Sequence, residues 1–169
     1  MVVGTEDAHV FGTTVLENLR VARGDVTVAQ ATEALARVAL GDWLAGLPDG
    51  LETVLGPDAR TVSGGERRRL LVARALLSSA PLLLVDEPAE HLDPDLADAV
   101  VGDLLRDPRG VVVVTHRVTP LAAADEVIWL ADGRVVARGT HALLAETLPD
   151  YREALALEQP AAHGGNGRA

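Results

Sequence analysis

Residues 62–68, Val-Ser-Gly-Gly-Glu-Arg-Arg, and residues 82–88, Leu-Leu-Leu-Val-Asp-Glu-Pro, decide the fold of this chain. In the first stretch, a serine and two glycines open a segment with helical periodicity, so bare backbone N–H groups stand at a positive helix end that can bind phosphate. In the second, a carboxylate pair follows an apolar strand, which suits Mg²⁺ and an attacking water. The sequence contains no lysine, so it lacks the phosphate-binding loop Gly-x-x-x-x-Gly-Lys-Ser/Thr. The two stretches therefore predict part of a nucleotide-phosphate site.

The composition of the chain argues against several classes of function. Its 169 residues, 48% of them apolar, are enough for one domain with a core. All 15 basic residues are arginine against 25 acidic residues, and this excess of negative charge argues against a nucleic-acid partner. The absence of cysteine excludes disulfides and thiolate chemistry. No signal peptide is visible, and the apolar runs are far shorter than the roughly 20 residues of a membrane helix, so any link to a membrane is expected to pass through a partner.

Helical periodicity dominates the first half of the chain, and short apolar runs dominate the second half. The pattern predicts helices at residues 14–20, 28–40, 64–78, 94–105, 141–146 and 151–157, with a helical turn at 42–47 and a loop at 48–61. It predicts strands at residues 82–86, 111–115, 126–130 and 134–137, with a hairpin turn at Asp132 and Gly133. Continuous apolar strands that alternate with helices indicate a parallel sheet covered on both faces.

Over residues 2–157 the chain resembles the nucleotide-binding domain of the ATP-binding-cassette (ABC) superfamily. Residues 62–66 are similar to its signature Leu-Ser-Gly-Gly-Gln, with valine for leucine and glutamate for glutamine. The resemblance implies that this motif faces the ATP bound to the opposite domain, through Ser63, Gly64, Gly65 and Glu66. A hydroxyl and two unshielded glycine amides can donate to phosphate oxygens. The alternative interpretation is an ordinary turn that caps a helix.

Residues 82–86 resemble the second phosphate-site motif of the same family. The resemblance implies that Asp86 holds Mg²⁺ through water and that Glu87 polarises the attacking water. A general base must lie within hydrogen-bond reach of that water, and the carboxyl end of a central strand fixes it there. The alternative interpretation is a charged turn before a helix.

Two further residues extend the predicted site. His116 follows the strand at residues 111–115 and resembles the switch histidine that senses the γ-phosphate, although a lone histidine is more often structural. Glu6 stands where the family has glutamine. Its carboxylate can bind Mg²⁺ but lacks the donor of the amide, so it is a candidate metal ligand.

Residues 90–93 stand where the family has a loop that touches the partner domain. Leu92 and Asp93 match this loop, so Asp93 is an expected nucleotide-site contact. Glu90 and His91 do not match it and are expected to be solvated.

Other segments resemble particular branches of the family. Residues 14–19, Thr-Val-Leu-Glu-Asn-Leu, and residues 132–141 are typical of exporter-type cassettes. Residues 6–11 and 90–93 are similar to the C-type subunit of the heterodimeric thiol-reductant exporter linked to cytochrome bd assembly.

The resemblance implies an α/β fold of the P-loop NTPase (RecA-like) class, a mostly parallel sheet with an inserted helical subdomain. Val2 and Val3 read as the tail of a strand, so we expect the chain to begin inside this fold, truncated at the N-terminus without the phosphate-binding loop. Residues 1–80 are expected to hold the linking loop, the helical subdomain and the signature helix. Residues 81–157 are expected to hold the RecA-like part, and residues 158–169 a disordered tail.

The function implied is that of a partial ATP-binding and ATP-hydrolysing subunit of an ABC exporter, with ATP and Mg²⁺ as cofactors. Its expected partners are a transmembrane domain and a second nucleotide-binding domain, at the cytoplasmic face of the membrane. Without the lysine loop the chain alone is expected to be inactive, since that loop neutralises much of the phosphate charge. The alternative is a catalytically silent module that completes the ATP site of a partner subunit.

Overall fold

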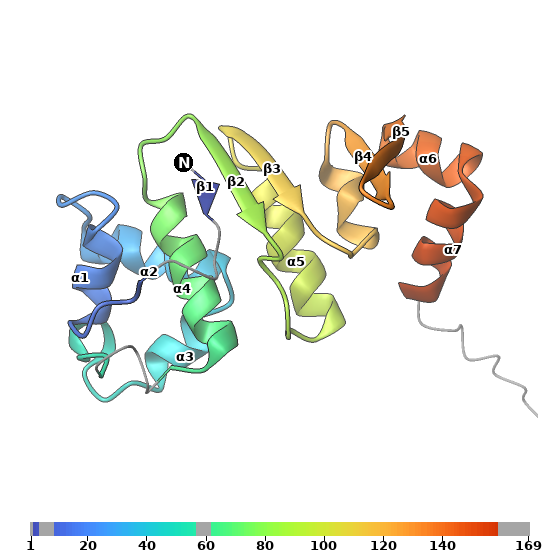
Figure 1. Ribbon diagram of the computed structural model, residues 1–169. Helices are drawn as coiled ribbons and strands as arrows, with labels where there is room; N and C mark the ends of the chain where they lie inside the picture. Colours follow the sequence, from blue (N-terminus) through green and yellow to red (C-terminus); the bar gives the residue numbers. More distant parts are fainter. Residues whose placement is uncertain (1, 4–8, 57–61, 159–169) are drawn as a thin grey trace, which may run out of the picture. The chain divides into compact units, whose positions relative to one another are not determined.

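The computed structural model describes residues 2–3, 9–56 and 62–158, and the chain divides into two compact units (Figure 1). The first unit, Met1–His116, holds a parallel sheet and five α-helices among its described residues. The second unit, Arg117–Ala169, holds an antiparallel hairpin and short helices. The domain division that the sequence predicts at residue 80 remains a prediction.

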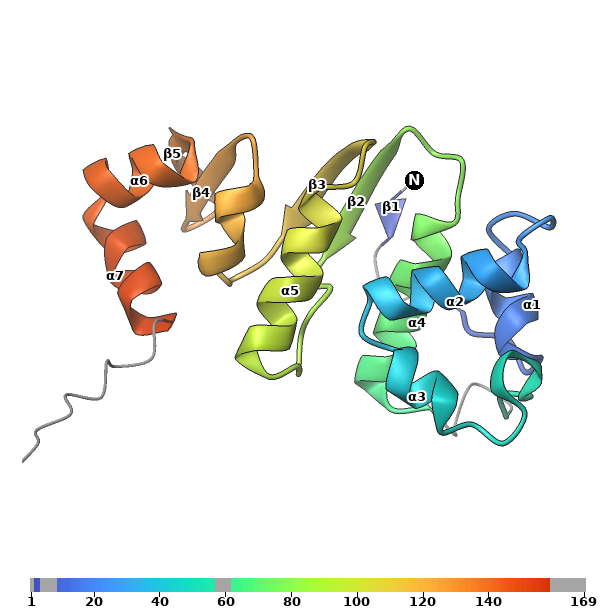
Figure 2. The ribbon, with the colours of Figure 1, turned by 180° about the vertical axis from the view of Figure 1, so that it is seen from behind.

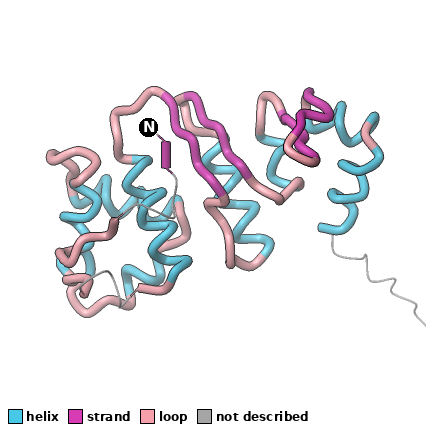
Figure 3. Tube along the Cα trace, in the orientation of Figure 1, coloured by secondary structure: helices cyan, strands magenta, loops and turns pink. Residues whose placement is uncertain are grey.

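The described segments between the first two strands are helices and loops (Figure 3). They contain α1 (Val15–Arg20), α2 (Val28–Arg37), α3 (Gly41–Ala45), the 3-10 helix η1 (Gly50–Glu52) and α4 (Gly64–Leu76). Side chains of Thr14, Thr27 and Ser63 cap α1, α2 and α4, each accepting a hydrogen bond from the backbone N–H three residues later. Helix α2 ends earlier than the predicted residue 40, because Ala39 adopts a left-handed φ of 57°.

Helix α4 lies at the centre of the core of this unit. All of its residues from 70 to 76 are buried, and the helix packs against α1, α2 and the sheet. Among them, Arg74 donates hydrogen bonds to the carbonyl oxygens of Asn18 (2.8 Å) and His9 (2.9 Å) and to Asn18 Oδ1 (2.9 Å). Burial lowers the pKa of this guanidinium. These bonds fasten α4 to the segment that leads into α1.

The sheet of the first unit is parallel, as predicted, with the strand order β1-β2-β3. Its strands are β1 (Val2–Val3), β2 (Leu82–Asp86) and β3 (Gly110–Val114). Helix α5 (Pro94–Leu105) connects β2 to β3 and packs against β3, as Figure 2 shows. The register pairs Asp86 with Val114, so the carboxyl ends of β2 and β3 lie at one edge.

The two faces of this sheet differ in burial. Leu83 and Val85 are buried in the helical core, whereas Leu82, Val112 and Val114 on alternate positions are about half exposed. The prediction of a sheet covered on both faces is therefore wrong for the described part of the chain. The apolar residues of each strand predicted the strand itself correctly. They could not show whether a second layer of helices covers the other face of the sheet.

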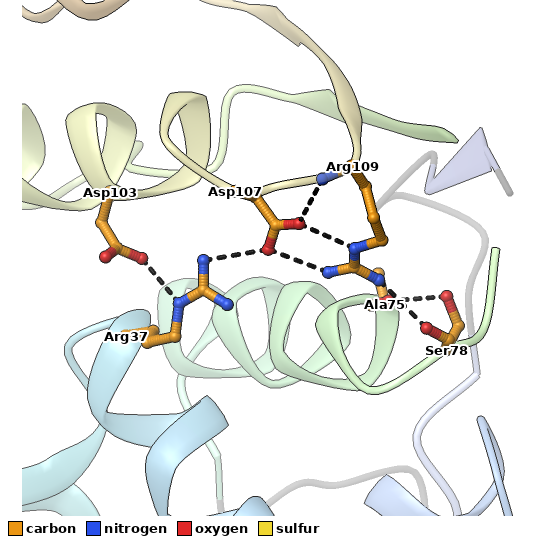
Figure 4. A network of polar contacts seen from close by, with 6 residues as sticks. All are labelled: Arg37, Ala75, Ser78, Asp103, Asp107 and Arg109. Atoms are coloured by element: carbon orange, nitrogen blue, oxygen red, sulfur yellow. Dashed lines mark hydrogen bonds and ion pairs between the residues drawn. The ribbon is translucent and has the colours of Figure 1, made fainter. Parts of the chain in front are cut away.

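A polar network joins α2, α5 and the end of α4 (Figure 4). Arg37 donates to Asp103 (2.7 Å) and to Asp107 (3.1 Å), and Arg109 donates to both oxygens of Asp107 at 2.7 and 3.0 Å. Arg109 also donates to the carbonyl oxygen of Ser78 at 3.0 Å. The Arg109 guanidinium holds the pKa of Asp107 well below its usual range, with Arg37 adding to the effect. The buried carboxylate of Asp107 thus links the end of α5 to α2 through Arg37, and to the end of α4 through Arg109.

The second unit is a hairpin backed by helices. It contains the 3-10 helix η3 (Thr119–Ala123), β4 (Val127–Ala131), β5 (Arg134–Gly139), α6 (His141–Thr147) and α7 (Pro149–Glu158). The predicted turn connects the strands, with positive φ at Asp132 (49°) and Gly133 (70°), as a type I′ turn requires. Glu158, which the sequence placed in a tail, ends α7 and accepts hydrogen bonds from the backbone N–H groups of Val118 and Thr119.

Tyr151 is the centre of the small core in the second unit. It is fully buried, its ring meets Trp129 edge-on at 5.2 Å, and its hydroxyl lies 2.8 Å from His141 Nδ1. Burial, with the nearby charge of Glu158, raises the pKa of Tyr151 to about 12, so the phenol stays protonated near neutral pH.

We expect Tyr151→Phe to lower the free energy of unfolding of the second unit by about 1 kcal/mol, because it removes the hydrogen bond to His141 and leaves the ring packing intact. The measurement is urea unfolding followed by the fluorescence of Trp129 in a Trp43→Phe background. Leu157→Ala, on the same helix at a side chain that is 80% exposed, is the matched control and should change little. Equal stability of Tyr151→Phe and the parent would show that the hydrogen bond between Tyr151 and His141 does not stabilise the second unit.

Candidate functional site

The carboxyl edge of the parallel sheet brings Glu87 and His116 together. Glu87 directly follows β2, and His116 stands two residues after β3. The backbone N–H of His116 donates to Glu87 Oε1 at 3.0 Å, and His116 Nδ1 lies 3.1 Å from both carboxylate oxygens. Because a carboxylate can only accept, Nδ1 is the protonated nitrogen in this contact. The ring is otherwise exposed, so Nε2 is free to meet a ligand from outside.

The backbone of Glu87 is held in an unusual conformation. Its φ is 43°, in the left-handed region that residues other than glycine rarely adopt, and its N–H donates to the carbonyl oxygen of Val114 at 2.9 Å. Such conformations cluster at functional sites, where the surrounding structure holds them in place. Here the turn aims the Glu87 carboxylate at the end of the neighbouring strand.

Asp86 is the candidate metal ligand that the structure places at this edge. It is the last residue of β2 and is exposed. Mg²⁺ keeps several waters and takes one or two carboxylates, so an exposed carboxylate beside Glu87 fits such an ion. Within residues 2–3, 9–56 and 62–158, no cluster of three or more histidine, aspartate or glutamate side chains could hold a metal by itself. Glu6, the second candidate ligand, lies outside the described residues.

The second candidate surface is the start of α4. Ser63 is the N-cap, its hydroxyl accepting from the backbone N–H of Glu66 at 3.2 Å, and the Glu66 carboxylate accepts from the backbone N–H of Ser63 at 2.8 Å. A Cβ at Gly64 would meet nothing within 4 Å, and one at Gly65 would meet only the tip of Arg69 at 3.5 Å. Packing against the described residues therefore does not explain the two glycines, which leave this side of the helix end open to a close approach.

This helix end opens onto a cavity of about 520 Å³. It is lined by Ser63, Gly64, Gly65, Arg68, Arg69, His91 and Leu92. Asp93, the predicted contact in the same loop, is the N-cap of α5, and its Oδ1 accepts from Leu96 N–H at 3.1 Å.

Sequence reasoning missed three residues of this surface. Glu90 forms an ion pair with Arg68, so the expectation that Glu90 is merely solvated is wrong, whereas the His91 side chain is 76% exposed, as expected, and lines the cavity. The opposite charges of Arg68 and Glu90 were the signal in the sequence that could have indicated this ion pair. No local spacing rule connects residues that far apart, so only the fold could pair them.

Comparison with known proteins decides the family of the chain. Residues 1–90 match the family model described as ABC transporter. The chain belongs to the ABC transporter family. An ABC transporter domain has the α/β fold of P-loop NTPases, so the predicted fold class is confirmed at that level. Domains of this family bind ATP, generally with Mg²⁺.

Relatives of this ABC transporter chain are much longer. The ATP-dependent lipid A-core flippase of Photobacterium profundum is 37% identical over 142 residues, which cover 82% of this chain and 24% of the flippase. The mycobactin import ATP-binding/permease protein IrtA of Mycolicibacterium smegmatis is 36% identical over 151 residues, which cover 88% of this chain and 17% of that protein. This chain therefore spans about a quarter or less of these relatives.

A solved structure supports the same fold. A bacterial Atm1-family ABC exporter with ATP bound aligns with a TM-score of 0.78 and 28% identity, over 94% of this chain and 28% of that chain. Every helix in the described part of our chain is too short or too polar to cross a bilayer.

Proposed function

We propose that this chain is an ATP-binding and ATP-hydrolysing part of an ABC exporter and couples MgATP hydrolysis to transmembrane transport. The observation that carries the proposal is the contact between Glu87 and His116 at the carboxyl edge of β2 and β3. In doubly wound sheets, ligands bind at this edge. An oriented carboxylate there can accept a proton from an attacking water. With Nδ1–H on Glu87, the exposed Nε2 of His116 can donate to a phosphate oxygen only when the ring carries both protons.

The roles of the residues follow from their positions. Glu87 polarises the water, and His116 orients Glu87 through Nδ1 and meets the γ-phosphate through Nε2. Asp86 would hold Mg²⁺ through water, with Glu6 as a further ligand, and the ion when bound would neutralise charge on the phosphate oxygens. Ser63, Gly64 and Gly65 would present the start of α4 to ATP held by a second nucleotide-binding domain.

The remaining assignments complete the proposal. A transmembrane domain and a second nucleotide-binding domain are the proposed partners, and the cytoplasmic face of the membrane is the proposed location. Because the chain contains no lysine, a lysine-bearing phosphate loop must come from polypeptide outside it, and the chain alone is proposed to be inactive. Resemblance over residues 6–11 and 90–93 supports the narrower proposal of the C-type subunit of a thiol-reductant exporter.

A second candidate function is a catalytically silent module that completes the ATP site of a partner. The open cavity at the start of α4 favours it, because that surface needs no lysine loop of its own. The placed carboxylate of Glu87 argues against it, since a silent module has no use for an oriented base. Both candidates share the surface around Ser63 and differ at Glu87.

Association with a nucleotide-loaded second domain tests the shared part of the proposal. We expect the chain to bind a second nucleotide-binding domain of its transporter in the presence of MgATP, and far less with MgADP. Ser63→Arg should weaken this binding at least about tenfold, because the arginine side chain would occupy the part of the cavity beside Gly64 and Gly65 where the phosphate is proposed to bind. Ser79→Arg, the same change at an exposed residue beyond the other end of α4, is the matched control. Equal binding of both variants would reject the proposed surface.

A further inference from the structure

The carboxylate of Glu158, at the end of α7, holds the backbone that follows His116. Glu158 Oε1 accepts from the backbone N–H of Val118 at 2.7 Å, and Oε2 accepts from the backbone N–H and the hydroxyl of Thr119, both at 2.8 Å. The first N–H groups of a helix have no partner inside it, and Val118, at the N-cap of η3, has no side-chain oxygen to offer them. A residue 40 positions later in the chain therefore supplies the acceptors.

The contacts keep Glu158 ionised. Burial raises the pKa of this partly buried carboxyl, but the hydrogen bonds from the backbone of Thr119 and Val118 outweigh burial, and the charge of Arg117 adds to their effect. The pKa of Glu158 therefore lies below its usual value. Hydrogen bonds to a charged acceptor are shorter and stronger than those between neutral groups, so this carboxylate is a firm anchor for the backbone.

His116 lies between two such anchors. On one side, its own N–H and Nδ1 are held by the Glu87 carboxylate. On the other side, only Arg117 separates it from Val118, whose side chain is buried and whose N–H is held by Glu158. Each intervening residue has only two soft backbone dihedrals, so fixing Val118 restricts the backbone at His116. The His116 side chain is 72% exposed, so packing does little to fix it.

We propose that Glu158 is a positioning residue for ATP hydrolysis, which holds the backbone of His116 where its ring meets Glu87. The inference rests on the proposed function, because it takes the contact between His116 and Glu87 as part of the hydrolytic site. Glu158 itself contacts neither residue among the hydrogen bonds of the described chain; it acts through Val118 and Thr119. The competing explanation is that Glu158 only caps η3 and stabilises the second unit.

Amide hydrogen exchange of the full chain, followed by nuclear magnetic resonance, separates the two explanations. Glu158→Ala should speed exchange of the His116 N–H about tenfold, because its contact with Glu87 opens more often, while the amides of β2 and β3 exchange at the parent rate. Glu158→Gln keeps the length and one acceptor oxygen, and should limit the increase to about threefold. Glu153→Ala, at an exposed glutamate on the same helix, is the matched control and should exchange like the parent.

Two results would overturn the inference. Unchanged exchange at His116 in Glu158→Ala, with faster exchange at Val118 and Thr119, would leave Glu158 as a cap of η3. Faster exchange throughout β2 and β3 would assign the effect to lost stability. If Glu158→Ala does not fold, Thr119→Val removes one of the three hydrogen bonds and should speed exchange at His116 about twofold, and an unchanged rate would again overturn the inference.

Hydrolysis by the assembled transporter shows whether the positioning serves the reaction. Glu158→Ala should lower kcat for ATP about tenfold and change KM less than about twofold, because it disturbs the reacting groups rather than ATP binding. A parent kcat in Glu158→Ala, beside a Glu87→Gln variant that does not hydrolyse ATP, would reject the role of Glu158 and leave the proposed function standing. Hydrolysis by Glu87→Gln at the parent rate would reject the proposed function, whereas the exchange result at His116 would still report the contact itself.

Discussion

Replacing Asp107 with asparagine is expected to lower the free energy of unfolding of the unit Met1–His116 by about 3 kcal/mol. The Asp107 side chain is 2% exposed and accepts hydrogen bonds from Arg37 and Arg109 (Figure 4). Asparagine keeps the shape but removes the charge, so two partly buried guanidinium groups lose their common partner. The measurement is urea unfolding followed by the fluorescence of Trp43 in a Trp129→Phe background.

Asp103→Asn is the matched control for this prediction. Asp103 also pairs with Arg37, but its side chain is 46% exposed, so water can replace the lost contact. We expect this variant to lose less than about 1 kcal/mol. Comparable losses in both variants would mean that the network does not depend on the buried carboxylate.

Low pH should remove the stabilisation that the charged Asp107 carboxylate provides. The folded pKa of Asp107 lies below its unfolded value, because Arg109 stabilises the charged form. The contribution is therefore fully present above the unfolded pKa of about 4 and is lost as the pH falls below it toward the folded pKa. The stability difference between the parent and Asp107→Asn should shrink as the pH drops from about 5 to about 3. A difference that stays constant over that range would assign the effect to packing alone.

The parts of the fold that sequence reasoning predicted well are those with strong local signals. Strand β2 (Leu82–Asp86) and helix α5 (Pro94–Leu105) have the predicted bounds, because Pro81 precedes the strand and the pair Asp93-Pro94 caps the helix. The 3-10 helix η3 (Thr119–Ala123) was missed because a single tight turn leaves no periodic pattern.

The candidate site also has one part that the sequence predicted and one part that it did not. Glu87 and His116 could be predicted as neighbours because parallel strands end at one edge of a sheet. The roles of Arg68, Glu90 and His91 could not, because they depend on a contact between α4 and the turn after β2. Tertiary packing sets such contacts, and the spacing of residues along the sequence does not predict them.

Under the proposed function, replacing Glu87 with glutamine is expected to lower the rate of ATP hydrolysis by the assembled transporter about 1,000-fold. Glutamine preserves the size of the side chain and one acceptor oxygen for His116, but it cannot take a proton from water. ATP binding should change little, because the lost step is chemical rather than a binding contact. Glu52→Gln, at an exposed glutamate on η1, is the matched control and should hydrolyse ATP at the parent rate.

Single-turnover release of phosphate from the assembled transporter, measured with the parent, Glu87→Gln and Glu52→Gln, shows whether the edge formed by β2 and β3 is a site of ATP hydrolysis. The claim of hydrolysis at this edge predicts that Glu87→Gln holds ATP without cleaving it, while Glu52→Gln behaves like the parent. Phosphate release from Glu87→Gln at the parent rate would contradict the claim and would leave this chain as a silent module beside the ATP of a partner.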